Sequence, residues 1–282
     1  MTDFNWMLWI VTPIIIVYYL YRHVWPAVRK FIRLFQGIRI NPRSHLTEAE
    51  YKKLSVGSLY ALQQGAYLNS LTLDIKDKLP TILADWWGIC NAQDAKQTLE
   101  YLGKKGFAYY FPHVYQAFLL DDEEAKDRIF QQHMDSQEDY DKAVEQLHNL
   151  EDCYDELLEC GTITCREDLL RYGVTGWDAG RLNFMARACY DMKYISEDEA
   201  WHYINHAYEM VHSRFSSWHD FAMSYVIGRA YGEVKAASNS GMMYMAEDLL
   251  KSEKARGQNR MVTNVPAGSE CCFLSKYQEF VI

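Results

Sequence analysis

Apolar residues recur at intervals of three and four along most of the chain, the spacing of one face of an α-helix. Three consecutive helices are predicted between Gly173 and Gly232. Their apolar positions are Leu182, Met185, Ala186 and Cys189, then Ala200, Ile204, Ala207 and Val211, and finally Trp218, Phe221, Ala222 and Tyr225. This spacing predicts an all-α protein in which helical hairpins pack into a multi-helix bundle.

Polar residues mark where several of these helices begin. Ser196 and Glu199 have the spacing of a capping box, in which each side chain binds a backbone amide at the helix start. Asn91 and Asp94 repeat the arrangement. Gly173 and Gly176 interrupt the chain, so we expect Asp178 to cap the helix that follows.

Two segments between these helices combine a helical pattern with strong charge. Residues 137–158 predict one helix with a single apolar face and an acidic back. The charged run at 121–127 is typical of a solvated helix start.

The run from Trp6 to Tyr21 contains no charged residue. As a helix it would be about 24 Å long, short of the roughly 30 Å hydrocarbon core of a bilayer, but the aromatic residues at both ends suit the two membrane interfaces. We therefore predict a single transmembrane anchor at residues 1–21. A buried helix of a soluble protein is the alternative. A cleavable signal peptide fits less well, because Asp3 stands where positive charge is required and no small-residue cleavage site follows.

Positive charge lies on one side of this run only. No Lys or Arg precedes it, whereas residues 22–43 form a basic juxtamembrane segment. The positive-inside rule then predicts a single-pass membrane protein with its amino terminus outside and its main domain in the cytoplasm. The segment could also lie along anionic headgroups, although a plain stop-transfer flank explains it more simply.

We expect a helical domain at residues 44–235 and a weakly structured tail at 236–282. Residues 1–43 hold six of the 29 Lys and Arg and one of the 38 Asp and Glu, which leaves the rest a net charge near −14. An acidic domain is unsuited to nucleic acid, whose binding requires phosphate neutralisation, and better suited to a basic protein partner.

The chain lacks the common signatures of catalysis and cofactor binding. It has no Gly-rich phosphate loop, Gly-x-Ser-x-Gly elbow or dinucleotide fingerprint, so we assign no catalytic residue and expect no cofactor. Its seven cysteines include no Cys-x-x-Cys pair and are expected to be mostly reduced.

His202 and His206 are weak candidates for a metal site. Histidines four residues apart on a helix can bind one metal ion. However, they lie opposite the apolar face and lack the Glu of a His-Glu-x-x-His motif, so we predict no metal site.

A second set of residues combines indole rings with charge: Trp177, Asp178, Arg181, Trp218 and Arg229. One interpretation is a pocket in which two guanidinium groups hold an anion or carboxylate between the rings. The other is an internal Asp–Arg ion pair with tryptophan packing that fixes the helices. The second interpretation is favoured.

The same stretch resembles a known family. Gly-Trp-Asp-x-x-Arg (Gly176 to Arg181), Ile-Ser-x-x-Glu-Ala-Trp (Ile195 to Trp201), Ser-Trp-x-x-Phe (Ser217 to Phe221) and the Gly228-Arg229 pair are similar to the bacterial family called domain of unknown function 1266. The similarity covers roughly residues 162–232, with a weaker echo at 87–106. It implies a small helical domain and brings no established reaction.

Two functional hypotheses follow. The first is a membrane-anchored, non-catalytic protein that binds a protein partner near the inner membrane, as an immunity or adaptor protein does. The second is an enzyme or sensor that binds a small anionic substrate at Trp177, Asp178, Arg181 and Arg229. An open cleft beside the arginines would favour the second, and a closed ion pair the first.

Overall fold

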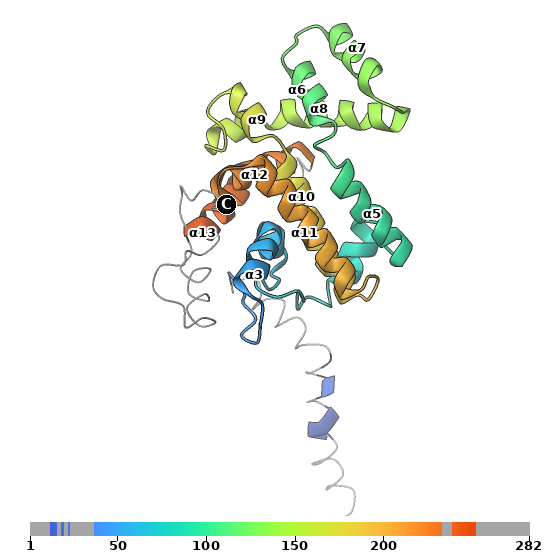
Figure 1. Ribbon diagram of the computed structural model, residues 1–282, viewed down its shortest axis with the longest axis vertical. Coiled ribbons are helices and arrows are strands. Elements are labelled where there is room, and N and C mark those ends of the chain that lie inside the picture. The colour runs from blue at the N-terminus through green and yellow to red at the C-terminus, as the bar shows by residue number, and fades with distance from the viewer. Residues whose placement is uncertain (1–11, 16–17, 20–21, 23–36, 233–238, 252–282) are drawn as a thin grey trace, which may run out of the picture.

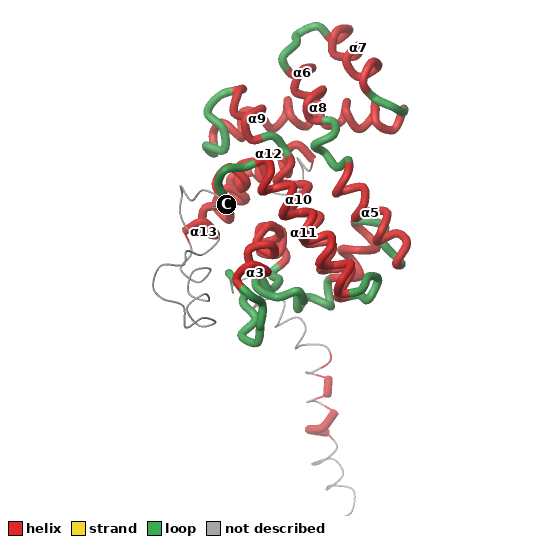
Figure 2. The backbone as a smooth tube through the Cα atoms, viewed as in Figure 1, coloured by secondary structure: helices red, strands yellow, loops and turns green. Residues whose placement is uncertain are grey.

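The computed structural model describes residues 12–15, 18–19, 22, 37–232 and 239–251 (Figure 1). In this part of the chain the regular structure is helical, apart from one isolated parallel bridge between Arg39 and Tyr67 (Figure 2). The predicted all-α class is confirmed. The elements are α3 (Glu48–Leu54), the 3₁₀ turn η2 (Ser55–Gly57), α4 (Ser58–Gln64), the π-helical segment η3 (Thr81–Trp86), α5 (Ala92–Lys104), α6 (Phe111–Phe118), α7 (Glu123–His133), α8 (Gln137–Glu159), α9 (Arg166–Tyr172), α10 (Thr175–Asp191), α11 (Glu197–Arg214), α12 (Trp218–Gly232) and α13 (Asn239–Lys251).

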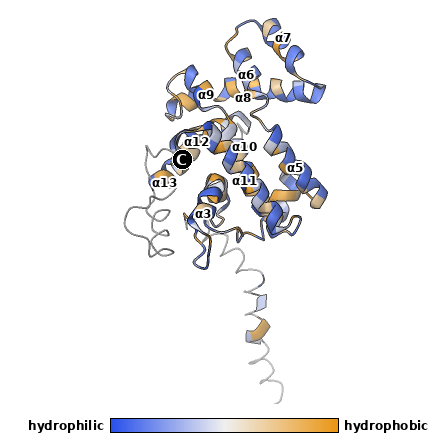
Figure 3. Cartoon of the chain, in the orientation of Figure 1, coloured by the Kyte–Doolittle hydropathy of each residue, from blue (hydrophilic) through white to orange (hydrophobic). Residues whose placement is uncertain are grey.

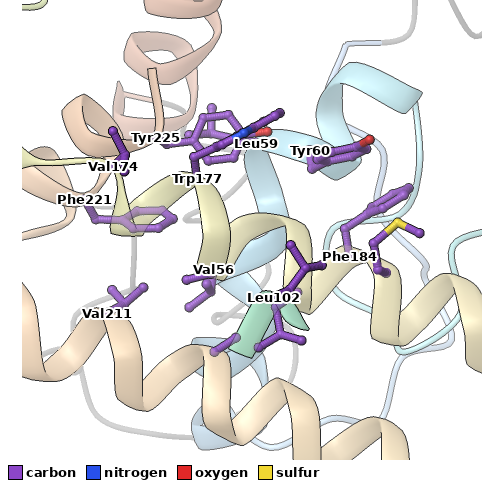
Figure 4. Packing of buried hydrophobic residues seen from close by; sticks show 14 of the residues in the cluster. Val56, Leu59, Tyr60, Leu102, Val174, Trp177, Phe184, Val211, Phe221 and Tyr225 are labelled. Carbon is purple, nitrogen blue, oxygen red and sulfur yellow. The ribbon is translucent and has the colours of Figure 1, made fainter. Parts of the chain in front are cut away.

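Helix α10 is the centre of the molecule. Every residue from Gly176 to Cys189 is buried, and α11, α12, α5 and the η2–α4 segment surround the helix. Figure 4 shows Trp177 and Phe184 on α10 packing against rings of its neighbours. The ring centroid of Tyr60 lies 5.8 Å from that of Trp177 and 4.4 Å from that of Phe184. The ring of Tyr225 meets that of Trp177 edge-on, with 5.0 Å between the centroids.

In α10 and α12 the buried residues include the predicted apolar face and also the other sides of each helix. In α12 all residues from Phe221 to Tyr231 are buried as well. A helix enclosed on every side needs no polar face, so small and even charged residues occupy positions where an amphipathic pattern would place solvent-facing side chains.

Two glycines allow α10 and α12 to cross closely. A Cβ on Gly176 would lie 2.7 Å from the carbonyl oxygen of Phe221, and one on Gly228 would overlap the Cβ of Trp177. Because these neighbours are backbone or backbone-attached atoms, they cannot move aside as the end of a flexible side chain can. The crossing therefore requires glycine at both positions.

Ser224 of α12, rather than Asp178, satisfies the start of α10. The Ser224 hydroxyl accepts a hydrogen bond from the Gly176 amide at 2.9 Å and donates one to the Gly173 carbonyl at 3.1 Å. Asp178 lies inside the helix, so its predicted capping role is wrong. A side chain 48 residues away provides the cap, which local sequence rules cannot anticipate.

Other predicted helix starts are confirmed. Ser196 and Glu199 form the reciprocal hydrogen bonds of a capping box at the start of α11. The Asn91 side chain accepts the amides of Gln93 and Asp94 at the start of α5. The run at 121–127 contains the start of α7, which Asp122 caps.

A buried arginine attaches the amino-terminal loops to α10. Arg187 is fully buried and donates from Nη2 to the carbonyl oxygens of Tyr67 at 2.5 Å and Ser70 at 2.6 Å. One turn later, Asp191 accepts the Leu73 amide at 2.8 Å. Burial lowers the pKa of Arg187 to about 10, opposed by Asp191, so the side chain remains charged near neutral pH.

Packing extends past the predicted domain limits of 44–235. Ile38 belongs to the core, and Arg39 pairs with Asp74 at 2.5 Å. At the other end, α13 buries Met242 and packs on α12, and Glu156 of α8 accepts two hydrogen bonds from Asn239. Of the predicted tail 236–282, the structure describes only residues 239–251.

Within the described residues, no helix has the length and apolarity needed to cross a bilayer. Most of the predicted span Trp6–Tyr21 lies outside them, as does most of the basic segment 22–43.

Candidate functional site

Asp178 and Arg181 form an ion pair one turn apart on α10. The side chains are 1% and 7% exposed, so both charges lie inside the protein. Arg181 donates from Nη2 to one carboxylate oxygen of Asp178, and the Ala108 amide donates to the other at 2.7 Å. Burial raises the pKa of Asp178, while Arg181 and the amides of Phe107 and Ala108 oppose that rise.

Aromatic rings surround the guanidinium of Arg181. Its central carbon lies 4.0 Å from the ring centroid of Phe107, 5.1 Å from Trp177 and 5.7 Å from Trp87. Cations are attracted to the faces of such rings, most strongly where water is excluded. The rings thus contribute to the stability of a charge that is paired with one carboxylate.

The turn before α6 fits closely around Asp178. Gly106 has a φ of +52°, a conformation that side chains disfavour, and a Cβ there would overlap the Asp178 carboxylate. This glycine allows the backbone to approach closely enough for the Ala108 amide to reach the carboxylate. Asp178 therefore binds the 106–108 turn to α10.

Trp218 and Arg229 lie near opposite ends of α12. Trp218 opens α12, about 15 Å along the helix from Gly228, and its ring lies 5.6 Å from Phe221. Arg229 directly follows Gly228 and is 3% exposed. Ion-pair and ring contacts join Trp177, Asp178 and Arg181 to Phe107 and Trp87 in a cluster centred on α10.

Two hydrogen-bond donors in this cluster have no acceptor among the described residues. They are the indole Nε1 of Trp177 and the Nε of Arg181, both buried. The carboxylate–guanidinium pair itself is closed. The cluster can hold helices together as it stands, and an added acceptor would have these two donors available.

Of the two candidate metal-binding histidines, His206 contacts a neighbouring helix and His202 is exposed. His206 Nε2 lies 2.9 Å from the Gly103 carbonyl oxygen at the end of α5, and the exposed His202 ring meets Tyr203. Across the described residues, no group of three or more His, Cys, Asp or Glu side chains is placed to hold a metal ion.

The cysteines of the described residues are free thiols. Burial raises the pKa of both Cys153 and Cys189 to about 12, which keeps them protonated and poorly nucleophilic near neutral pH. Neither has the electropositive, accessible setting of a reactive cysteine.

A second polar network joins the 105–110 segment to α8. Asp139 is 5% exposed, and its carboxylate accepts hydrogen bonds from Lys105 at 2.6 Å, Tyr110 at 2.7 Å and Ser136 at 3.0 Å. Burial opposes the ionised form, yet these three donors lower the pKa of Asp139 to about 2.

Several residues with distant partners were not predicted from the sequence. Phe107 lies in the turn before α6, and Asp139 and Arg187 lie on helices, but the local pattern of these segments carries no sign of a partner more than 30 residues away. Trp87 and Gly106 did have a signal in the sequence, because they are the first and last residues of the segment 87–106, where the family pattern is weakly repeated.

Comparison with known proteins extends that pattern. A family model described as "Protein of unknown function (DUF1266)" matches residues 82–259, more than half of the chain and considerably more than the predicted 162–232. The "Uncharacterized protein YbeU" of Escherichia coli (strain K12) is similar to the chain. It is 23% identical over 188 residues, which cover 67% of this chain and 72% of YbeU. No solved structure matches.

Proposed function

The chain belongs to the DUF1266 family, and we propose that it is a membrane-anchored, non-catalytic protein that binds a protein partner near the bacterial inner membrane, as an immunity or adaptor protein does. The amino terminus lies outside and the helical body lies in the cytoplasm. The partner is a basic protein rather than a nucleic acid. The proposal assigns no catalytic residue, metal or cofactor to the body.

The closed pair of Asp178 and Arg181 is the observation that carries the non-catalytic part. A group that acts on a substrate must reach it, whereas these charges are buried and occupied by each other and by the Ala108 amide. Tryptophan and phenylalanine rings cover the guanidinium. The cluster therefore supports an architectural role, which leaves the outer surface to carry the binding.

Exposed apolar side chains near the amino terminus support the anchor. Ile14, Ile15, Tyr18 and Tyr19 are 58–63% exposed, and these residues lie apart from the helical body (Figure 1). Such a group in water is costly, and a lipid environment removes that cost. The basic residues after the run support the inward orientation of the body.

Affinity capture tests this proposal. The full-length protein is extracted with detergent from its native membranes, beside an Arg181→Met variant shown to fold. We expect one protein at a stoichiometric ratio with both versions, since the arginine stabilises the body and does not touch the partner. Loss of the partner in a folded Arg181→Met protein would contradict the architectural role, and an absence of any partner would contradict the binding function.

The two buried donors favour a second candidate, an enzyme or sensor that binds a small anion at Trp177, Asp178, Arg181 and Arg229. Trp177 Nε1 and Arg181 Nε belong to the same face of α10 and would suit an oxygen acceptor that enters between the rings. Mass spectrometry of the small molecules released when the purified protein is denatured tests this candidate. A stoichiometric anion that is released from the wild-type protein and not from Arg181→Met would favour the anion-binding function over the partner-binding function.

A further inference from the structure

Helix α7 buries little of its surface. Of its 11 residues, only Lys126 and Phe130 are buried. The helix packs mainly on α6 and α8, at the upper end of the body in Figure 1, and most of it is hydrophilic (Figure 3). An element with so few buried side chains opens at a lower free energy than the core does, so a change in one contact can decide whether it stays in place.

Two histidine rings stack where α7 meets α6. The ring centroids of His113 on α6 and His133, the last residue of α7, lie 4.2 Å apart, and the ring planes differ by 18°. Rings that are nearly parallel cannot direct their nitrogen lone pairs at one ion, so the pair is not arranged as a metal site. Because histidine is the side chain whose charge changes near neutral pH, this contact depends on the protonation of its two rings.

His113 lies in a setting that disfavours its charged form. Its Nδ1 atom is buried and has no hydrogen-bond partner within the described residues. In a neutral ring this nitrogen can carry a lone pair, whereas in the imidazolium ion it carries a proton that needs an acceptor. Protonation therefore buries a donor without an acceptor and places a positive charge against the ring of His133. Burial, followed by the charge of His133, lowers the pKa of His113.

Charged groups on the elements packed against α6 have other partners. On α7, Lys126 pairs with Glu123 and Glu151 at 2.8 Å each. Just after α7, Asp135 accepts the Tyr109 hydroxyl at 2.7 Å. The remaining groups are Asp139 of α8, which binds Lys105 and Tyr110, and Arg166 and Glu167 of α9, which lie near Phe118 and Tyr115. None of these charges is among the causes of the lowered pKa, so no carboxylate offsets a proton on the α6 member of the pair.

We propose that the stacked pair of His113 and His133 is a pH-sensitive latch, which holds α7 on α6 at neutral pH and releases it in mild acid. Because folding lowers the pKa of His113, the neutral stack contributes its full stability above about pH 6.5, the ordinary value for histidine, and loses it as the pH falls further. A second proton, on His133, adds repulsion between like charges. The latch is independent of the proposed binding function, so either can fail without the other.

Hydrogen exchange of the detergent-solubilised full chain tests the latch. Exchange is followed by mass spectrometry between about pH 7.5 and about pH 5 and corrected for the chemical exchange rate at each pH. We expect peptides of α7 to lose protection several-fold at the lower pH, while peptides of α10 keep theirs. His113→Phe should abolish the change, because a ring without a titrating nitrogen retains the stack. His133→Phe should reduce it, since the buried Nδ1 of His113 remains. His148→Gln, at an exposed position of α8, is the control and should behave as the wild type.

Three outcomes would overturn the latch. The first is protection of α7 that does not change between these pH values, and the second is the same change in His113→Phe as in the wild type. The third is an equal loss of protection in α10, which would indicate general acid unfolding rather than release of one helix. If His113→Phe does not fold, the comparison of the wild type with His133→Phe decides, and an equal pH dependence of the two contradicts the latch.

Discussion

The carboxylate of Asp178 and the guanidinium of Arg181 neutralise each other inside the protein, one turn apart on a helix that is buried on all sides. Removing one member leaves the other charge buried without its partner, which typically costs about 3–5 kcal/mol. Through the Ala108 amide, the carboxylate of this pair also holds the 106–108 turn on α10, and the strength of the pair can be measured.

We expect Asp178→Ala and Arg181→Ala each to lower the free energy of unfolding by about 3–5 kcal/mol in urea titrations, and the double variant to cost less than their sum. Glu138→Ala is the control, because its exposed pair with Lys142 should contribute at most about 1 kcal/mol. Additive losses would show that the two buried residues do not act as a pair.

The close crossing of α10 and α12 gives a second prediction. Gly228→Ala should destabilise the protein by about 1–3 kcal/mol, since the new methyl group meets the Cβ of Trp177 and the Val174 carbonyl oxygen. Gly103→Ala on α5 is the matched variant, because its methyl group would meet only side-chain atoms, those of the His206 ring and, less closely, of Leu182. Thermal unfolding should rank Gly228→Ala well below Gly103→Ala, and the reverse order would contradict the crossing.

Asp139 predicts a specific pH dependence. Its pKa is about 2 in the folded protein and about 3.9 in an unfolded chain, so its stabilisation is complete above about pH 5 and is lost as the pH falls toward 2. Asp139→Asn should cost about 1–3 kcal/mol at pH 7 and much less at pH 2.5. The check is the urea midpoint of both proteins across this range. A difference that stays constant with pH would show that the carboxylate charge is not what matters.

The proposed anchor predicts how the protein partitions. Ile14→Lys/Ile15→Lys should release the chain from membranes washed with alkaline carbonate, because each lysine opposes insertion by about 2.5–3.5 kcal/mol. Ile14→Leu/Ile15→Leu should remain in the pellet as the wild type does. Release of the wild-type chain under the same wash would contradict a spanning anchor, whatever the variants do.

Features set by neighbours in the chain could be predicted from the sequence. The capping box of Ser196 and Glu199, the acidic back of α8 and the pairing of Asp178 with Arg181 each depend on residues three or four positions apart. At that distance the helix fixes the geometry, so the spacing alone specifies which side chains meet.

Features set by distant segments could not be predicted. Phe107 and Trp87 reach Arg181 from 74 and 94 residues away, and Ser224 caps a helix on which it does not lie. Burial on every side also removes the periodicity that identifies a core face, as in α10. Trp218 and Arg229 were grouped by residue type, yet about three helical turns of α12 separate them.

The hydrogen bonds of Arg187 attach residues that precede the family match to helix α10. The family match begins at residue 82, but a chain that starts there would lack the carbonyl oxygens of Tyr67 and Ser70. Arg187 would then retain a charge in the core with its strongest acceptors gone, and Asp191 would lose the Leu73 amide. A chain that begins at residue 82 is therefore expected to be less stable than one that begins near Ile38.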